Sequence, residues 1–258
     1  MKIKDCKTFL LTLGYGRSGS SMLGNILNQH PNCLITMESR FLGNYYKDNN
    51  KETKLLSQLI KKAYFEHENQ SIKLLNNQND HKNNNLKIKK GNIFVYGDKK
   101  SGGNTTIFIN DPQFQEKFMN INKNIKIIIN LRNPYNIMKS IKKSKYYNRC
   151  SSYIKCNENT SDKDIFKDIL YYQNYSINFY KKYIKSCLIV YYDDIINKTK
   201  DTLNNLFCFL NIDYIDALYT LVNTKKKESN IMPINYINYV KLFIDKENLY
   251  YFNRYIKE

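Results

Sequence analysis

The sequence predicts a single α/β domain in which a central parallel sheet of about five strands is flanked by helices. Three observations predict this fold. Short apolar runs, each of a length typical of a buried strand, alternate along the chain with segments of helical periodicity. The first run leads through a glycine-rich turn into an amphipathic helix, as in a parallel βαβ unit. A chain of 258 residues can also bury one good core, so no second domain is required.

The first αβ unit carries a turn that is typical of phosphate-binding sites. Residues 8–13 form an apolar run that fits a buried parallel strand. Residues 14–21 follow with the sequence Gly-Tyr-Gly-Arg-Ser-Gly-Ser-Ser. The next helix has an apolar face made of Met22, Leu23, Ile26 and Leu27. Three glycines let the backbone turn sharply and bring its N–H groups against an anion, and the helix N-terminus adds positive dipole character there. We therefore expect a P-loop-like turn that binds phosphate.

The residue types in this turn restrict the compound that it can bind. In the nucleotide triphosphatase loop, G-x-x-x-x-G-K-[ST], a lysine reaches the β and γ phosphates. Gly14, Gly19 and Ser21 match that pattern, but Ser20 stands at the position of the lysine. The cation lies inside the turn instead, as Arg17, which suits a donor with fewer phosphates.

The remaining elements follow in the order that a parallel sheet requires. Further strands are expected at residues 33–37, 93–97, 125–131 and 188–192. Helices are expected at 52–66, from 111–112 onward, from 134 to about 147, and at 161–185, 199–211 and 246–257. Residues 69–92 are rich in Asn and Lys and lack periodicity, which predicts a surface insertion within one domain that spans 1–258.

Three charged residues follow the ends of predicted strands. Glu38, Lys99 and Arg132 come after the strands at 33–37, 93–97 and 125–131. Since ligands of parallel α/β sheets bind outside the carboxyl ends of the strands, we expect these side chains to converge on the glycine-rich turn. A triphosphatase would place an Asp after such a strand to organise Mg²⁺, whereas this chain has Arg132, followed eight residues later by Ser140.

These motifs together resemble the sulfotransferases that use 3′-phosphoadenosine 5′-phosphosulfate (PAPS). The segments that carry the resemblance are 14–21, 27–31 (Leu-Asn-Gln-His-Pro), 38–40 (Glu-Ser-Arg) and 132–140. The spacing from Arg17 to Glu38 is closest to the tyrosylprotein branch of that family. The resemblance implies transfer of a sulfuryl group from PAPS to an acceptor hydroxyl, with 3′,5′-ADP as product and no metal.

The resemblance also implies roles for individual residues. Glu38 would be the base that takes the acceptor proton, Arg17 would contact the leaving 5′-phosphate, and Lys99 would contact the sulfuryl oxygens. Lys100 competes with Lys99, because the register is uncertain by one residue. The cofactor-binding residues would be Gly16, Arg17, Ser18, Gly19, Ser20, Ser21, Arg132 and Ser140. His30 and the acidic pair Asp193–Asp194 would be structural. Met232 stands where the family has a cofactor-contacting lysine, which puts that contact in doubt.

Composition limits the partners. The net charge is +18, and only five of the 41 basic residues are arginine. The lysines are spread over the chain, as on a solvated surface. The electrostatic field of this positive charge favours an anionic cofactor or an acidic acceptor. Six cysteines without a C-x-x-C pair and three histidines argue against zinc, and Cys150 and Cys156 are near enough in sequence to pair. Apolar runs are too short to span a membrane, so a cytoplasmic location is expected.

Alternatives remain at this point. A P-loop nucleotide kinase is disfavoured by Ser20 and Arg132, and a catalytically silent, anion-binding member of the family is the other alternative. The acceptor is a protein tyrosine, a sugar or a small alcohol, because acceptor pockets lie in variable loops. No nucleic-acid partner is expected, and the oligomeric state does not follow from the sequence.

Overall fold

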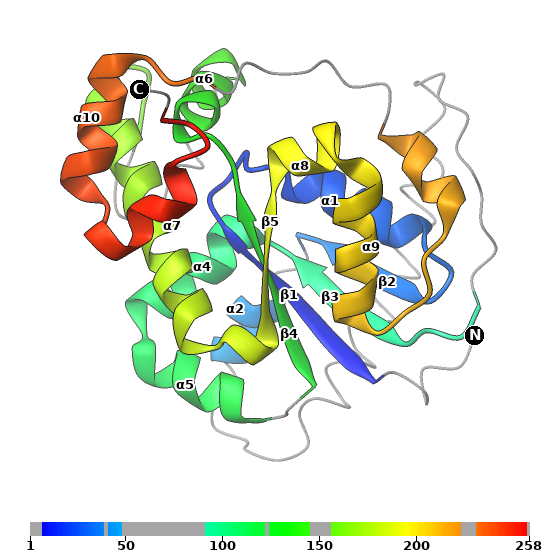
Figure 1. Ribbon diagram of the computed structural model, residues 1–258. Helices are drawn as coiled ribbons and strands as arrows, with labels where there is room; N and C mark the ends of the chain where they lie inside the picture. The colour runs from blue at the N-terminus through cyan, green and yellow to red at the C-terminus, as the bar shows by residue number, and fades with distance from the viewer. Residues whose placement is uncertain are drawn as a thin grey trace.

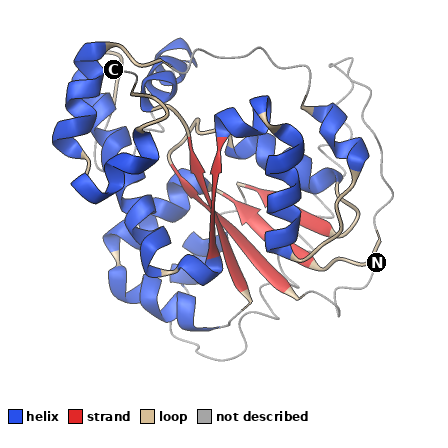
Figure 2. Ribbon diagram, in the orientation of Figure 1, coloured by secondary structure: helices blue, strands red, loops and turns tan. Residues whose placement is uncertain are grey.

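The computed structural model describes residues 7–38, 41–47, 91–121, 124–144, 156–222 and 231–256. Within these ranges the chain forms one five-stranded sheet, in which neighbouring strands are parallel. The strand order is β2-β3-β1-β4-β5, and helices cover both faces (Figures 1 and 2). The strands are β1 (Thr8–Gly14), β2 (Cys33–Met37), β3 (Val95–Lys99), β4 (Ile125–Leu131) and β5 (Cys187–Tyr191). The predicted single α/β domain with a parallel sheet is therefore confirmed.

The helices alternate with the strands as expected. They are α1 (Ser20–Gln29), α2 (Phe41–Lys47), α4 (Ser101–Asn110), α5 (Pro112–Ile121), α6 (Pro134–Ser144), α7 (Asp162–Lys182), α8 (Tyr192–Asn197), α9 (Thr199–Leu210) and α10 (Ile234–Phe243). Three 3₁₀ segments are η4 (Ile184–Ser186), η5 (Asp216–Leu221) and η6 (Lys246–Phe252). The helix predicted at 52–66, and all but the last two residues of the predicted insertion at 69–92, lie outside the described residues.

Alternation along β1 divides the interior into two cores. Phe9, Leu11 and Leu13 pack into the larger core, which is shared with α4, α5, α6, α7 and α10. Leu10 points to the opposite face and packs with α1 and α9. Successive side chains of a strand point to opposite faces, so a run that is apolar throughout can be buried on both sides. The central position of β1 follows from this pattern.

Two elements differ from the sequence-based expectation near the glycine-rich turn. β3 extends to Lys99, two residues beyond the predicted strand, because Asp98 stays buried in the sheet and accepts a hydrogen bond from Thr36 Oγ1 at 2.9 Å. Helix α4 was not predicted, since its sequence Ser-Gly-Gly-Asn-Thr-Thr resembles a loop. Its polar side chains instead bond to β1. For example, Ser101 Oγ donates to Thr12 Oγ1 at 2.9 Å.

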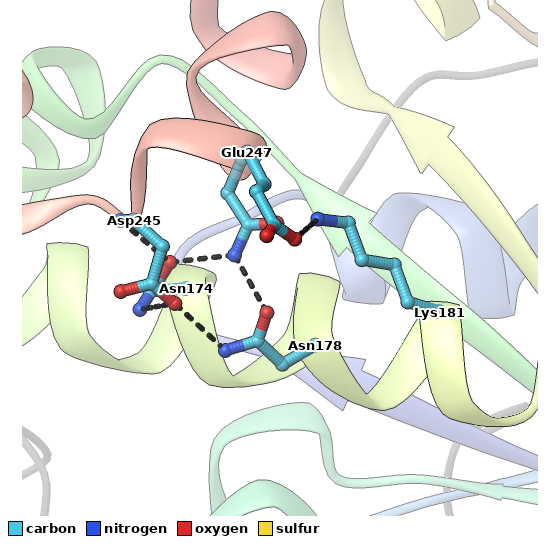
Figure 3. A network of polar contacts seen from close by, with 6 residues as sticks. Asn174, Asn178, Lys181, Asp245 and Glu247 are labelled. Carbon is cyan, nitrogen blue, oxygen red and sulfur yellow. Dashed lines mark hydrogen bonds and ion pairs between the residues drawn. The ribbon is translucent and has the colours of Figure 1, made fainter.

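The C-terminal part also differs. An α-helix was predicted over 246–257, but the chain forms α10 first and then the 3₁₀ segment η6. Side-chain amides of α7 fix this segment, as Figure 3 shows. Asn174 and Asn178 each donate to Asp245 Oδ2 at 3.0 Å, and these two bonds hold the pKa of Asp245 below its usual value. The buried Asn248 donates to the Oδ1 atoms of the same two asparagines at 2.7 Å.

Candidate active site

The turn between β1 and α1 has the backbone conformation of an anion cradle. Gly14 and Gly19 adopt φ angles of 132° and 93°, which glycine reaches without strain. Gly19 is the N-cap of α1, no side chain caps the helix there, and its first turn contains no acidic residue. The first N–H groups of α1 therefore remain available to an anion, and the helix dipole favours negative charge at the same point.

The serines of the turn differ in exposure. Ser18 is fully buried, and its Oγ has no hydrogen-bond partner among the described residues. Ser20 is also buried, while Ser21 is exposed at the start of α1. Buried hydroxyls are normally hydrogen-bonded, so Ser18 has bonding capacity for a ligand or an ordered water.

Glu38, Lys99 and Ser21 meet at one end of this turn. Lys99 Nζ lies 2.6 Å from Glu38 Oε1 and 3.0 Å from Ser21 Oγ. The lysine side chain is 4% exposed, whereas that of Glu38 is 50% exposed. Met37 pairs with Lys99 in the β2–β3 register, which brings the following residue, Glu38, to the same edge of the sheet. A buried ammonium thus connects the glycine-rich turn with a carboxylate that faces solvent.

The structure distinguishes the two candidate lysines by position. Lys99 ends β3 and contacts Glu38 and Ser21. Lys100 is the N-cap of α4, and its side-chain carbons lie over Gly103. The geometry therefore favours Lys99 as the lysine of this site.

Two of the candidate site residues, Arg17 and Glu38, have a strained backbone. Among the described residues, three non-glycine residues have a positive φ: Arg17 at 68°, Glu38 at 64° and Asn211 at 57°. Asn211 ends α9 as its C-cap, a position that asparagine tolerates. The other two are the residues that the sequence singled out as cation and base. Left-handed conformations of such residues cost free energy and cluster at functional sites.

A second group of side chains lies on the other side of the turn. Arg17 Nε donates to Ser140 Oγ at 3.0 Å, and Arg132 Nη1 donates to the carbonyl oxygen of Arg17 at 2.6 Å. Arg132 is 7% exposed, and Gln173 Nε2 donates to its backbone oxygen at 2.7 Å. The residue predicted to bind the 5′-phosphate is therefore in direct contact with the two residues predicted to bind the 3′-phosphate.

Tyr192 belongs to this group and was not predicted. The Arg132 guanidinium lies 4.2 Å from the centre of its ring. A Cβ added to Gly19 would be 2.2 Å from Tyr192 Cδ2. The sequence offered one weak signal, an aromatic residue at the end of the strand predicted over 188–192. The ring thus contacts both the turn and the arginine, and it requires glycine at position 19.

The residues expected to be structural bond to other parts of the protein. His30 is buried, and its Nδ1 accepts from Asn32 N at 3.1 Å, so Nε2 carries the proton and donates to Asp213 O at 2.8 Å. Asp193 and Asp194 lie in the first turn of α8. Asp194 forms a two-point ion pair with Arg254, with N–O distances of 2.6 and 2.9 Å.

Some candidate residues lie outside this site or outside the described residues. Met232 is buried in the larger core. Arg40 and Cys150 are not described, so their contacts and a pairing of Cys150 with Cys156 stay untested. Within the described ranges no group of three metal-ligating side chains comes together. No helix there combines the length and the apolar character needed to cross a bilayer.

Sequence comparison assigns the chain to a family. Residues 10–216 match the profile of the Sulfotransferase family, which is more than half of the chain. The chain belongs to the sulfotransferase family. No curated protein matches it significantly in sequence.

Solved sulfotransferase structures share the fold of this sulfotransferase. The domain from the curacin biosynthetic pathway superposes with a TM-score of 0.54 at 16% identity, covering 96% of this chain and 87% of that one. The domain of the Synechococcus PCC 7002 olefin synthase gives 0.53 at 16% identity, with 92% and 86% coverage. The sulfotransferase from Alicyclobacillus acidocaldarius gives 0.51 at 12% identity, with 92% and 91% coverage. The family is thus confirmed, and the tyrosylprotein branch stays a prediction.

Proposed function

We propose that this sulfotransferase moves a sulfuryl group from PAPS to an acceptor hydroxyl. The observation that carries the proposal is the position of Lys99 Nζ, which bonds both to Glu38 and to Ser21 at the end of the glycine-rich turn. A base, a cation and an anion cradle are thereby within one hydrogen-bonded unit. Family membership supports sulfuryl transfer over the phosphoryl transfer of a nucleotide kinase.

The residues present fit a donor with phosphates at both the 5′ and the 3′ positions. The turn offers positive-φ glycines, an uncapped helix N-terminus and the unpartnered hydroxyl of Ser18. We assign Gly16, Arg17 and residues 18–21 to the 5′-phosphosulfate, and Arg132 with Ser140 to the 3′-phosphate. Bound PAPS supplies an activated sulfuryl group whose leaving group is a phosphate.

Three side chains would carry the transfer. Glu38 Oε1 is held by Lys99, and the other oxygen of this half-exposed carboxylate would take the proton of an acceptor hydroxyl. Lys99 is already aimed at the end of the turn, where its ammonium would stabilise negative charge on the sulfuryl oxygens. Arg17 would neutralise the charge that develops on the 5′-phosphate. Proton transfer, charge stabilisation and leaving-group stabilisation are then divided among separate residues.

Protein tyrosine in an acidic segment is the acceptor that we would test first. The spacing of Arg17 and Glu38 resembles the tyrosylprotein branch, and the net charge of +18 attracts acidic molecules. A sugar hydroxyl and a small alcohol form the other arms of the same test.

The proposal is tested in two steps. Calorimetry should detect micromolar binding of 3′,5′-ADP in buffer without Mg²⁺, and weaker binding of 5′-AMP. A screen with ³⁵S-labelled PAPS should then find transfer to an acidic tyrosine peptide, an oligosaccharide or an alcohol. Absence of 3′,5′-ADP binding would overturn the donor assignment. Binding without transfer to any acceptor class would favour the silent anion-binding alternative.

A further inference from the structure

A buried carboxylate that the proposed chemistry does not use lies beneath the glycine-rich turn. Asp168 is on α7, 4% exposed, and its Oδ2 accepts a hydrogen bond from Tyr15 Oη at 2.6 Å. Tyr15 is the second residue of the turn and is 2% exposed. Its neighbours Gly16 and Arg17 are progressively more exposed, so the tyrosine anchors the first part of the turn in the interior.

Other buried contacts hold the same part of the turn. Tyr172, one helical turn after Asp168, packs edge-on against the Tyr15 ring with centroids 5.3 Å apart. On the α4 side, Thr105 Oγ1 accepts from Gly14 N at 2.9 Å. A Cβ at Gly102 would approach Gly16 N to 3.3 Å, so α4 also lies close against the turn. The first three residues of the turn are therefore enclosed between α4 and α7.

A carboxylate at this position needs a physical reason. A buried charge costs free energy unless it is hydrogen-bonded, and a negative charge under an anion-binding loop also repels the ligand. A charge-assisted bond from a hydroxyl is about twice as strong as a neutral one, and it fixes the direction of the tyrosine. Rigid support of a binding loop matters because its N–H groups must already point at the ligand when it arrives.

We propose that Asp168 is a positioning residue for donor binding. Through Tyr15 Oη it fixes the backbone of residues 14–16, so that the N–H groups of the turn stay aimed at the 5′-phosphosulfate. The identity of that ligand rests on the proposed function. The support of the turn by the Asp168–Tyr15 pair does not depend on it.

Two variants and a matched control test this role. Tyr15→Phe removes the hydroxyl, and Asp168→Asn keeps an acceptor without the charge. Tyr175→Phe is the control. Tyr175 lies on α7 and, like Tyr15, donates its hydroxyl to a side chain, in this case that of Gln115 on α5. All three proteins are compared below their thermal transitions, so that a general loss of stability does not enter.

The expected result is specific to the donor. Tyr15→Phe should raise the Kd of 3′,5′-ADP and the donor KM by about tenfold, equivalent to about 1.4 kcal/mol. Asp168→Asn should raise both by about threefold, since a neutral bond can re-form. The acceptor KM should stay within about twofold of wild type, and Tyr175→Phe should change none of these constants. Equal donor constants in Tyr15→Phe and wild type would overturn the proposal.

Hydrogen exchange separates this proposal from the proposed function. Amides of residues 14–21 should exchange faster in Tyr15→Phe and Asp168→Asn than in wild type and in Tyr175→Phe. If the wild type does not bind 3′,5′-ADP, the donor assignment fails, and the exchange result alone decides on the support of the turn. Unchanged exchange in both variants would overturn it.

Discussion

Replacement of Arg132 tests the 3′-phosphate assignment. Its guanidinium is almost fully buried, lies 4.2 Å from the centre of the Tyr192 ring, and donates through Nη1 to the Arg17 carbonyl. Arg132→Lys keeps the positive charge but loses the planar fork and the stacking. Arg132→Ala also loses the charge. The two variants therefore separate geometry from charge.

The expected loss of nucleotide affinity follows from these contacts. Loss of a charge-assisted phosphate contact costs about 2–4 kcal/mol, so Arg132→Ala should weaken 3′,5′-ADP binding by roughly 30- to 1000-fold. 5′-AMP lacks the 3′-phosphate. It would lose only the indirect support that the charged guanidinium gives to the turn through the Arg17 carbonyl, so its affinity should fall by less than that of 3′,5′-ADP. Arg132→Lys should fall between wild type and Arg132→Ala for 3′,5′-ADP.

Arg254 provides a matched control. It too stacks on a tyrosine, with its guanidinium 4.0 Å from the Tyr191 ring centre, but it pairs with Asp194 away from the turn. Arg254→Lys should lower the melting temperature and leave the affinity for 3′,5′-ADP within about twofold. Calorimetry with both nucleotides on all the variants makes the comparison. Equal losses of 3′,5′-ADP and 5′-AMP affinity in Arg132→Ala would refute the assignment.

Further predictions concern the turn, the metal and the C-terminal segment. Gly19→Ala should lower unfolding free energy by about 1–3 kcal/mol, because the added Cβ would meet the Tyr192 ring at a φ of 93°. Gly43→Ala, whose Cβ would lie at an ordinary contact distance of 3.6 Å from Ile107, should not destabilise the protein in the same thermal melts. EDTA should leave sulfuryl transfer intact, and loss of activity that Mg²⁺ restores would return the kinase alternative to first place. The lowered pKa of Asp245 stabilises the fold above the unfolded value of about 3.9, and this contribution disappears as the pH falls through the folded value. The melting-temperature advantage of wild type over Asp245→Asn should therefore shrink as the pH falls below about 4, and a constant difference would contradict this origin.

The sheet could be predicted from the sequence because its strands are unusually apolar. Runs such as Ile127–Ile129 are buried on both faces. A helix as short as such a run would leave the N–H and C=O groups at its ends without hydrogen-bond partners in the interior. Helix α4 escaped prediction for the opposite reason. Its glycines, asparagine and threonines have low helix propensity, and the helix is stabilised by buried bonds to Thr12 and Gly14 that only the folded chain brings near.

The candidate site was predictable where short motifs define it. The turn and the strand-end residues Glu38 and Arg132 follow from local sequence. Lys99 could be told from Lys100 only by the β2–β3 register, which sets Lys99 beside Met37. Tyr192 and Asp168 carried no recognisable motif, because each acts through a tertiary contact with the turn. The sequence thus pointed to candidate residues that have a chemistry of their own, and it gave no sign of the residues that contact and support them.

The assignment of Glu38 as base is tested by Glu38→Gln. The amide oxygen of glutamine can still accept a hydrogen bond from Lys99 Nζ, so the ammonium should stay between the turn and position 38. 3′,5′-ADP affinity should therefore hold within about threefold, or ~0.6 kcal/mol. The amide cannot take a proton, so kcat should fall by roughly 10²–10⁴-fold, the usual contribution of a positioned base.

Glu247→Gln is the matched control for that variant. Glu247 also forms an ion pair with a lysine, Lys181, at 3.3 Å, but it is exposed on η6. Its replacement should leave kcat unchanged, so a fall seen only in Glu38→Gln reports proton transfer and not the loss of an ion pair. Near-normal turnover of Glu38→Gln with every acceptor that the wild type uses would show that another group takes the proton. The strained φ of 64° at Glu38 would then serve only to connect β2 with α2.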